Sequence, residues 1–410
     1  MITLQECPET VLERLAHTAP DVEIWWDSSP LVYQSWAGRM LATVVPEKRS
    51  VLAEQLHRYY DPGSPAALFR GVTTNPPLSL TAIQDDPERW RQWITGYLHE
   101  HPDRSVEEVF WALYKEIVRL GADAFRPMFE ASGYRYGYIS GQVDPRQAFD
   151  ADRMLQQAQE LSALAPNVMI KVPGTAEGLT VLRRLTAQGV STNCTLAYVV
   201  PQFVAVAEAV QSGLLQARAN GVDLTRWRSV VTDMCVRWEN APEFELQAAQ
   251  AGVDLTLERK RWASVAIFKR AYQIFRARAY PSKMLLCSVR MGPTENGKLR
   301  SFHLEETAGA DVVITLPPVF LTELLTQGEH IGFERRIWKD IPDQEMDYLQ
   351  RIPYFNQAYE SDGIASDQFN TLPPLVSTYH EFAAATEKMV AFVRECVTQI
   401  RQLEPPLPVA

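Results

Sequence analysis

The chain has 410 residues, of which 46% are hydrophobic and 22% are charged, a balance typical of a globular protein with a sizeable buried core. Its formal net charge of -10 argues against general binding to nucleic acid or to an anionic membrane surface. We find no signal-like N-terminus and no apolar run of about 18 residues, which favours a cytoplasmic protein without a membrane span.

The predicted elements alternate along the chain between short apolar segments and longer amphipathic ones. The predicted strands are residues 22–26, 68–73, 134–140, 168–172, 190–193, 229–232, 283–287 and 311–314. Helical patterns cover residues 87–100, 105–120, 147–164, 178–188, 199–218 and 255–279. Eight strands alternating with helices predict an α/β fold, the (β/α)8 TIM barrel. An open doubly wound sheet is the alternative, but no GxGxxG turn follows the first strand.

Three segments exceed a compact barrel. We expect an additional N-terminal helix within residues 1–20 and an insert after the first strand, residues 28–67, with a helix at 48–60. The chain is loop-rich after about residue 330 and ends in a predicted helix, residues 377–403, before a proline-rich tail. We therefore expect a barrel of residues 1–328 and a C-terminal helical extension, residues 329–410, packed on it.

The cysteines and histidines indicate neither disulfides nor a metal. The cysteines lie far apart, are odd in number and form no CxxC pair, so we expect reduced thiols that mostly fill the core; they are Cys7, Cys194, Cys235, Cys287 and Cys396. The seven histidines show no metal-ligand spacing such as HExxH. A dedicated metal site is not expected.

Polar side chains gather where the predicted strands end. In a barrel, the chemistry lies at the C-terminal face, which the strand ends and following loops form. A protein without catalytic function would not need so many polar groups there. The set is Asp27, Asn75, Gln142, Lys171, Asn193, Thr195, Thr232, Arg237, Ser288 and Arg290.

Lys171 ends a strand apolar enough to be buried. Burial disfavours the charged ammonium and lowers the pKa of a lysine toward neutrality. The free amine can attack a carbonyl, and the protonated imine then accepts electrons when a neighbouring carbon–carbon bond breaks. The alternative is a lysine paired with a buried carboxylate, and the strand context alone leaves both open.

Several short motifs occur in the order of one known family. They are GVTTNP at residues 71–76, IKVPGT at 170–175, NCTL at 193–196, SVR at 288–290 and AGAD at 308–311. Together they resemble the transaldolase family over residues 21–328. The resemblance implies that a ketose phosphate is cleaved to leave a dihydroxyacetone unit on Lys171, and that an aldose phosphate accepts this unit. It implies carbohydrate metabolism of the pentose phosphate type and no external cofactor; barrels of this kind often dimerise, so a homodimer is one expected assembly.

The resemblance also implies roles for individual residues. Asp27 matches the acid/base aspartate, with a turn or helix cap as the alternative. Asn75 and Asn193 match asparagines that bind substrate hydroxyls, although Asn75 before a proline is also a common turn residue. Thr195 matches the threonine that positions a catalytic water. Thr232 stands where a serine contacts the substrate, and Thr175 could add a further hydroxyl.

Arg237, Ser288 and Arg290 match the family's phosphate-binding group. A guanidinium fork and a short hydroxyl donor suit a phosphate. On an extended segment, Ser288 and Arg290 would point to one side, which favours a shared ligand over a surface ion pair.

The third strand departs from the family pattern. Transaldolases usually have a glutamate where this chain has Gln142, and an amide cannot exchange a proton near neutral pH. A glutamine resembles the fructose-6-phosphate aldolase branch, but that branch adds a tyrosine where this chain has Met234. Three functions therefore stay open: a transaldolase, a Schiff-base aldolase that releases a free ketone, and a catalytically weakened sugar-phosphate-binding protein.

Overall fold

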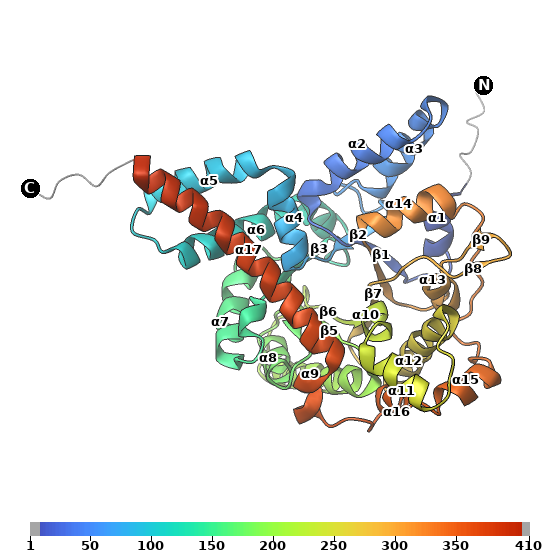
Figure 1. The fold of residues 1–410 in the computed structure, drawn as a ribbon. Coiled ribbons are helices and arrows are strands. Elements are labelled where there is room, and N and C mark those ends of the chain that lie inside the picture. The colour runs from blue at the N-terminus through green and yellow to red at the C-terminus, as the bar shows by residue number, and fades with distance from the viewer. Residues whose placement is uncertain (1–8, 404–410) are drawn as a thin grey trace, which may run out of the picture.

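The centre of the molecule is a closed barrel of eight parallel strands (Figure 1). The computed structural model describes residues 9–403. Around the barrel the strand order is β1-β10-β7-β6-β5-β4-β3-β2. The strands are β1 (Glu23–Trp26), β2 (Phe69–Val72), β3 (Tyr138–Gln142), β4 (Val168–Pro173), β5 (Thr192–Ala197), β6 (Ser229–Met234), β7 (Lys283–Cys287) and β10 (Val313–Leu316). The prediction of a (β/α)8 TIM barrel is confirmed; a short hairpin, β8 (Thr294–Glu295) and β9 (Lys298–Leu299), follows β7.

Helices surround the barrel and connect its strands (Figure 1). The first half contains α1 (Val11–Ala16), α2 (Tyr33–Thr43), α3 (Pro46–Tyr59), α4 (Pro76–Asp85), α5 (Pro87–Glu100), α6 (Val106–Ala131), α7 (Ala151–Ser162) and α8 (Ala176–Ala187). The second half contains α9 (Val200–Ala219), α10 (Cys235–Glu239), α11 (Pro242–Gln250), α12 (Leu257–Ala277), α13 (Phe302–Thr307), α14 (Pro318–Gln327), α15 (Asp343–Leu349), α16 (Pro353–Tyr359) and α17 (Pro373–Leu403). Short 3-10 turns lie at Pro30–Val32, Pro145–Gln147 and Ser366–Thr371.

Two predicted strands have different bounds in the structure. The strand predicted at 134–140 begins only at Tyr138, because positive φ angles at Tyr134 and Gly137 form a turn before it. The strand predicted at 190–193 runs over Thr192–Ala197, because its pairing with β4 and β6 continues toward the C-terminal face. The expectation that Asn193 lies at the end of its strand is therefore wrong; it is the second residue of β5.

The barrel interior has an apolar floor below a polar layer. The floor consists of Trp25, Tyr138, Met169, Val230, Leu285 and Val313, one from each of six strands. Side chains on a strand alternate between its two faces, so residues two positions further on also point inward. These are Asp27, Ser140, Lys171, Thr232, Cys287 and Thr315. Gly71 of β2 makes room for the floor, since a Cβ atom there would lie 2.5 Å from the Trp25 ring.

The segment after residue 330 is more helical than expected. The loop-rich prediction is wrong for α15 and α16, whose patterns are only seven residues long. The final helix begins at Pro373, four residues before the predicted start, because proline fits the first position of a helix. The predicted tail, residues 404–410, lies outside the described residues, as does Cys7.

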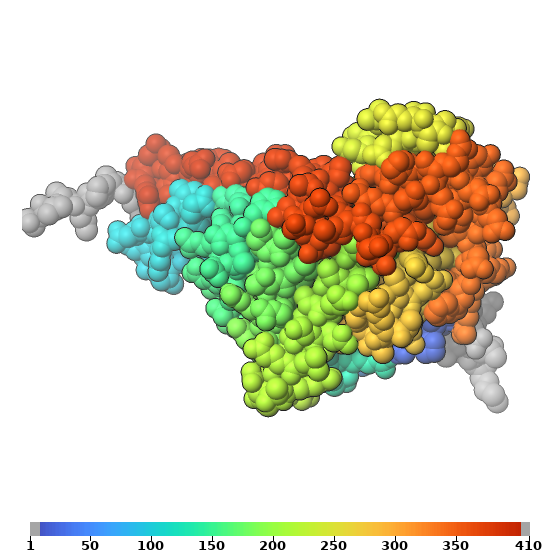
Figure 2. All heavy atoms as spheres, turned by 90° about the horizontal axis from the view of Figure 1, so that it is seen from below, coloured from blue at the N-terminus to red at the C-terminus, as the bar shows by residue number. Residues whose placement is uncertain are grey.

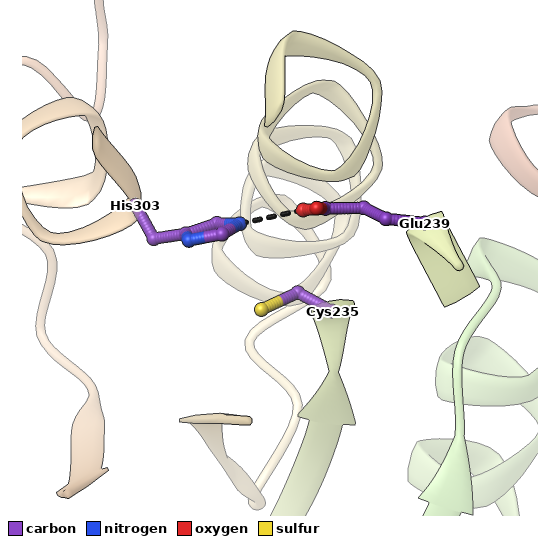
Figure 3. Close-up of side chains that lie close together, drawn as sticks. All are labelled: Cys235, Glu239 and His303. Carbon is purple, nitrogen blue, oxygen red and sulfur yellow. Dashed lines mark hydrogen bonds and ion pairs between the residues drawn. The ribbon is translucent and has the colours of Figure 1, made fainter. Parts of the chain in front are cut away.

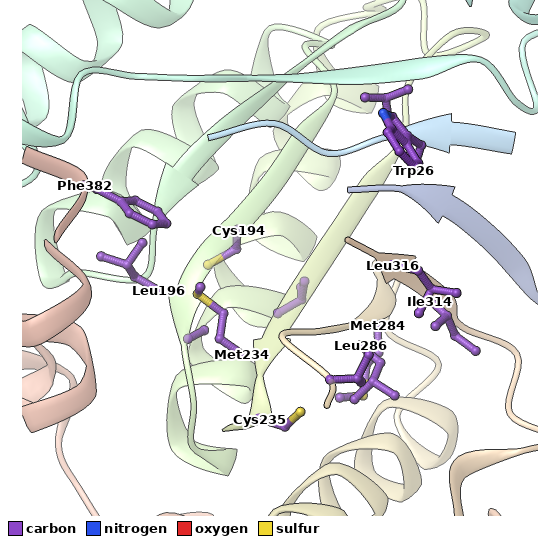
Figure 4. Packing of buried hydrophobic residues seen from close by; sticks show 14 of the residues in the cluster. Trp26, Cys194, Leu196, Met234, Cys235, Met284, Leu286, Ile314, Leu316 and Phe382 are labelled. Carbon is purple, nitrogen blue, oxygen red and sulfur yellow. The ribbon is translucent and has the colours of Figure 1, made fainter. Parts of the chain in front are cut away.

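Helix α17 crosses the C-terminal side of the barrel. It packs against α4, α5 and α6 and reaches the end of β5, and in Figure 2 the segment that includes it forms an orange-to-red strip along the upper side of the molecule. Figure 4 shows Phe382 of α17 pointing toward Leu196 of β5. The division into a barrel and an extension at residue 328 stays a prediction. Among residues 9–403, no helix has both the length and the apolar character to cross a membrane.

Candidate active site

Lys171 lies near the end of β4 with its side chain inside the barrel. Only 3% of the residue is exposed, and its Nζ donates to the Thr74 carbonyl at 2.9 Å. Its neighbours in register are Gln142 of β3 and Asn193 of β5. Within residues 9–403 its ammonium forms no ion pair, so the alternative of a lysine paired with a carboxylate is not what the structure shows. Burial lowers the pKa of Lys171, although the nearby Cys287 and Asp27 oppose this.

Asp27 follows β1 and faces the same interior. It is 7% exposed; its Oδ1 accepts a hydrogen bond from the Thr73 hydroxyl at 2.7 Å, and its Oδ2 lies 3.9 Å from the Cys287 Sγ. Burial raises the pKa of Asp27, although Lys171 pulls it down. The side chain that caps the next 3-10 turn belongs to Ser29, so capping does not account for Asp27.

Asn193 joins three strands through its side-chain amide. Its Nδ2 donates to the Ser140 hydroxyl at 3.0 Å, and its Oδ1 accepts from the Thr232 hydroxyl at 2.7 Å. Both ends of the amide thus have partners inside the barrel. These hydrogen bonds, which run from β3 to β6, hold the Asn193 and Thr232 side chains in fixed orientations next to Lys171.

Gln142 and Thr195 flank Lys171 on the neighbouring strands. Gln142 is 2% exposed, and its buried Oε1 has no hydrogen-bond partner in the part of the chain that the structure describes. Such a group needs a donor, which a water or a substrate hydroxyl could supply. Among residues 9–403, the one hydrogen bond of the Thr195 hydroxyl goes to the Met234 sulfur, at 3.7 Å, which is a weak acceptor. The Gln142 Oε1 can therefore still accept a hydrogen bond, and the Thr195 hydroxyl can still form stronger ones.

Two of the predicted residues cap the N-termini of helices. The Asn75 Oδ1 accepts from the Leu78 backbone N–H at 2.9 Å and caps α4. The Thr175 hydroxyl accepts from the Gly178 N–H at 3.0 Å and donates to the Ala148 carbonyl at 2.9 Å. Thr175 thus uses its donor and an acceptor within the scaffold, and the structure gives it a capping role in place of an open pocket hydroxyl.

The structure brings the residues predicted to bind phosphate only partly together. Arg237 of α10 donates from both Nη atoms to Glu381 of α17, at 2.5 and 2.9 Å. Arg290 is exposed and donates to its neighbouring backbone carbonyls. The prediction of an extended Ser288–Arg290 segment is wrong, because β7 ends at Cys287 and Ser288 has a φ of 63°. Arg237 follows the end of β6 and Arg290 follows the end of β7, so both lie at the same end of the barrel, and their charges lower the pKa of Asp27 against the effect of burial.

Sequence reasoning missed Cys287 and Glu381. Cys287 was expected to be a core cysteine, yet it lies beside Asp27, and burial raises the pKa of its thiol to about 12, so it stays protonated. Its position two residues after Leu285 on an inward face was the signal available. Glu381 gave no signal, since it reaches Arg237 from 144 residues further along the chain.

A second buried cluster joins α10, which follows β6, to α13. Cys235, Glu239 and His303 bring ligand-type atoms within 4.8 Å of one another (Figure 3). The Glu239 Oε1 accepts from His303 at 2.7 Å and from Ser264 at 2.5 Å, and its Oε2 pairs with Arg261. An ion there would compete with the Arg261 charge for the same carboxylate, so we interpret the cluster as a buried ion-pair network.

Burial by itself would raise the pKa of Glu239. The hydrogen bond from His303 and the charge of Arg261 outweigh it and hold that pKa below its usual range. Burial lowers the pKa of His303, so the imidazole is neutral near pH 7 and donates from Nε2 to the charged carboxylate.

A closed barrel of eight parallel strands with buried polar side chains at the ends of its strands is a framework typical of barrel enzymes. Residues 63–390 match the model of the family described as Transaldolase/Fructose-6-phosphate aldolase. The chain therefore belongs to the transaldolase/fructose-6-phosphate aldolase family. The prediction of a transaldolase-type barrel enzyme is confirmed at the level of the family.

Several relatives carry the name transaldolase. "Transaldolase" of Thiobacillus denitrificans is 31% identical over an alignment that covers 64% of this chain and 75% of the relative. "Transaldolase 1" of Streptomyces avermitilis is 33% identical, covering 50% of this chain and 53% of the relative. "Transaldolase" of Saccharopolyspora erythraea is 34% identical, covering 50% and 54%. The chain thus spans about half the length of the latter two relatives.

Proposed function

We propose that the chain transfers a dihydroxyacetone unit from a ketose phosphate to an aldose phosphate through a Schiff base on Lys171. The observation that carries this proposal is the environment of Lys171. Its amine is buried, is free of an ion pair within the described residues and lies near Asp27. Burial favours the neutral amine that must attack a carbonyl.

The proposed reaction uses the Lys171 amine and the Asp27 carboxylate. The Lys171 amine adds to the ketose carbonyl, and loss of water gives a protonated imine. Asp27 takes the proton of the hydroxyl next to the breaking carbon–carbon bond, and the bond's electron pair moves onto the imine to form an enamine. The first aldehyde leaves. The enamine then attacks the acceptor aldehyde, Asp27 returns the proton, and water releases the product ketose from Lys171.

A second candidate function is a Schiff-base aldolase that releases free ketone. Gln142 favours it, because a glutamine at this position resembles the fructose-6-phosphate aldolase branch, and Gln142 lies next to Lys171 in register. The unpartnered Oε1 of Gln142 is free to orient a water. Water that hydrolyses the enamine-derived imine would end the reaction before any acceptor binds.

One experiment tests both candidates. The protein is incubated with fructose 6-phosphate, reduced with borohydride, and digested for mass spectrometry. We expect a C3 adduct on Lys171 and none on Lys269, another buried lysine, whose pKa burial lowers to about 8. Lys269 is an internal control because it is held by the carbonyls of Arg336 and Lys339, outside the barrel.

The outcomes of this experiment separate the functions. Addition of erythrose 4-phosphate before reduction should remove the adduct by transfer; release of free ketone without an acceptor would instead support the aldolase. Absence of any adduct with every ketose phosphate tried would exclude both enzymes and leave a sugar-phosphate-binding protein. The absence of an external cofactor, a cytoplasmic location and a homodimer are further parts of the proposal.

Replacing Asp27 with asparagine should lower turnover by about 10² to 10⁴-fold, the usual contribution of general acid–base catalysis. Asparagine keeps the size of the side chain and can still accept from Thr73, but it cannot take the substrate proton. Bond cleavage then becomes slow while imine formation continues. Borohydride trapping should therefore show the intact C6 ketose on Lys171 in place of the C3 adduct; a C3 adduct at the wild-type rate would contradict the role of Asp27.

A further inference from the structure

Glu381 of helix α17 already pairs with the arginine expected to bind phosphate. Its two carboxylate oxygens accept from the two Nη atoms of Arg237 at 2.5 and 2.9 Å, the fork geometry that a phosphate also uses. The hydrogen bonds from Arg237 hold the pKa of Glu381 below its usual range, and the charge of Arg290 acts in the same direction. The carboxylate is therefore charged at neutral pH and lies in the field of both arginines.

The helix is fixed where it carries Glu381. The Tyr198 hydroxyl donates to the Thr378 hydroxyl at 2.9 Å, which ties α17 to the end of β5. Phe382 is fully buried, and the Arg237 guanidinium lies 5.5 Å from its ring centroid. Glu381 can leave Arg237 by turning its own side chain, whereas moving the helix would expose Phe382 and break the contact with Tyr198.

We propose that Glu381 determines donor specificity by competing with the distal anionic group of the substrate for Arg237. This inference rests on the proposed function. Arg237 and Arg290 alone would present two positive charges to a phosphate; Glu381 cancels one and occupies the bidentate edge of Arg237. The site therefore binds phosphorylated ketoses less tightly than two unpaired arginines would, and it admits ketoses with a neutral distal end alongside them.

The direct test measures binding of inorganic phosphate by calorimetry. Glu381→Gln should bind phosphate about 10-fold more tightly than the wild type, because the competing charge and its repulsion are gone. Glu387→Gln is the matched control. Glu387 lies on the same helix, its side chain is 58% exposed against 51% for Glu381, and it pairs with Arg146, which binds Asp144 and not the site. This control should leave phosphate affinity unchanged.

Two further measurements test whether the gain in phosphate affinity arises at Arg237. Adding Arg237→Gln to Glu381→Gln should abolish the gain in phosphate affinity. In steady-state assays, Glu381→Gln should lower the KM for fructose 6-phosphate by a similar factor and leave the KM for fructose unchanged. An unchanged phosphate affinity in Glu381→Gln, or an equal gain in Glu387→Gln, would overturn the inference. Calorimetry needs no turnover, so a gain in phosphate affinity without any Lys171 adduct would reject the proposed function, and with it a role in donor specificity, and would leave only the competition between Glu381 and an anion for Arg237.

Discussion

Replacing Lys171 with methionine is expected to lower the turnover of dihydroxyacetone transfer by at least about 10³-fold, because no other group can form the imine. Methionine has a similar length and needs no hydrogen-bond partner in a position that is only 3% exposed. The variant should therefore fold. Turnover is measured with fructose 6-phosphate and erythrose 4-phosphate, together with the borohydride adduct, which should disappear completely.

Lys269→Met supplies the matched control. Lys269 is also a buried lysine, 4% exposed, and burial also lowers its pKa. Its loss leaves two backbone carbonyls without a donor, so some loss of stability is expected, about 1–3 kcal/mol. Turnover of the folded protein should stay at the wild-type level. Substantial transfer by Lys171→Met, or an equal loss in both variants, would mean that Lys171 is not the nucleophile.

The barrel was predictable because each strand is a short apolar segment flanked by an amphipathic one. The strand β7 was predicted with both of its ends. The start of β3 was not, because it depends on a positive φ at Tyr134, which propensity does not favour for an aromatic residue. Helix α6 runs 11 residues beyond its predicted end, to Ala131, because its buried face continues through Phe125 and Phe129 against β3.

The site was predictable where a residue belongs to a strand end. Lys171 and Asp27 are close to one another because all strands of the barrel end on one face. The partners that come from helices were not predictable. Glu381 meets Arg237 only because α17 folds back across the barrel, and the position of Ser288 depends on a local turn that no periodicity encodes.

The buried network around Glu239 was also not predictable from the sequence, and its expected contribution to stability is large. Glu239 of α10 is fully buried against α12 and α13, and 64 residues separate it from His303. We expect Glu239→Gln to lower the free energy of unfolding by about 3–5 kcal/mol, because it leaves the buried Arg261 charge without a counter-charge. The shift of the urea midpoint at pH 7 measures this loss.

Glu245→Gln is the control for the same chemical change at the surface. Glu245 pairs with Lys260 on the neighbouring helix, but its side chain is 65% exposed, so Glu245→Gln should shift the urea midpoint far less than Glu239→Gln does.

The double variant Glu239→Met with Arg261→Met separates charge from packing. Because it removes both charges, it should recover most of the stability that Glu239→Gln loses. A metal bound by Cys235, Glu239 and His303 would give a different pattern. A chelator would then destabilise the wild type, and the double variant, which lacks one ligand, would stay as unstable as Glu239→Gln. An ion-pair network predicts an unchanged wild-type midpoint with chelator, and this comparison decides between the two.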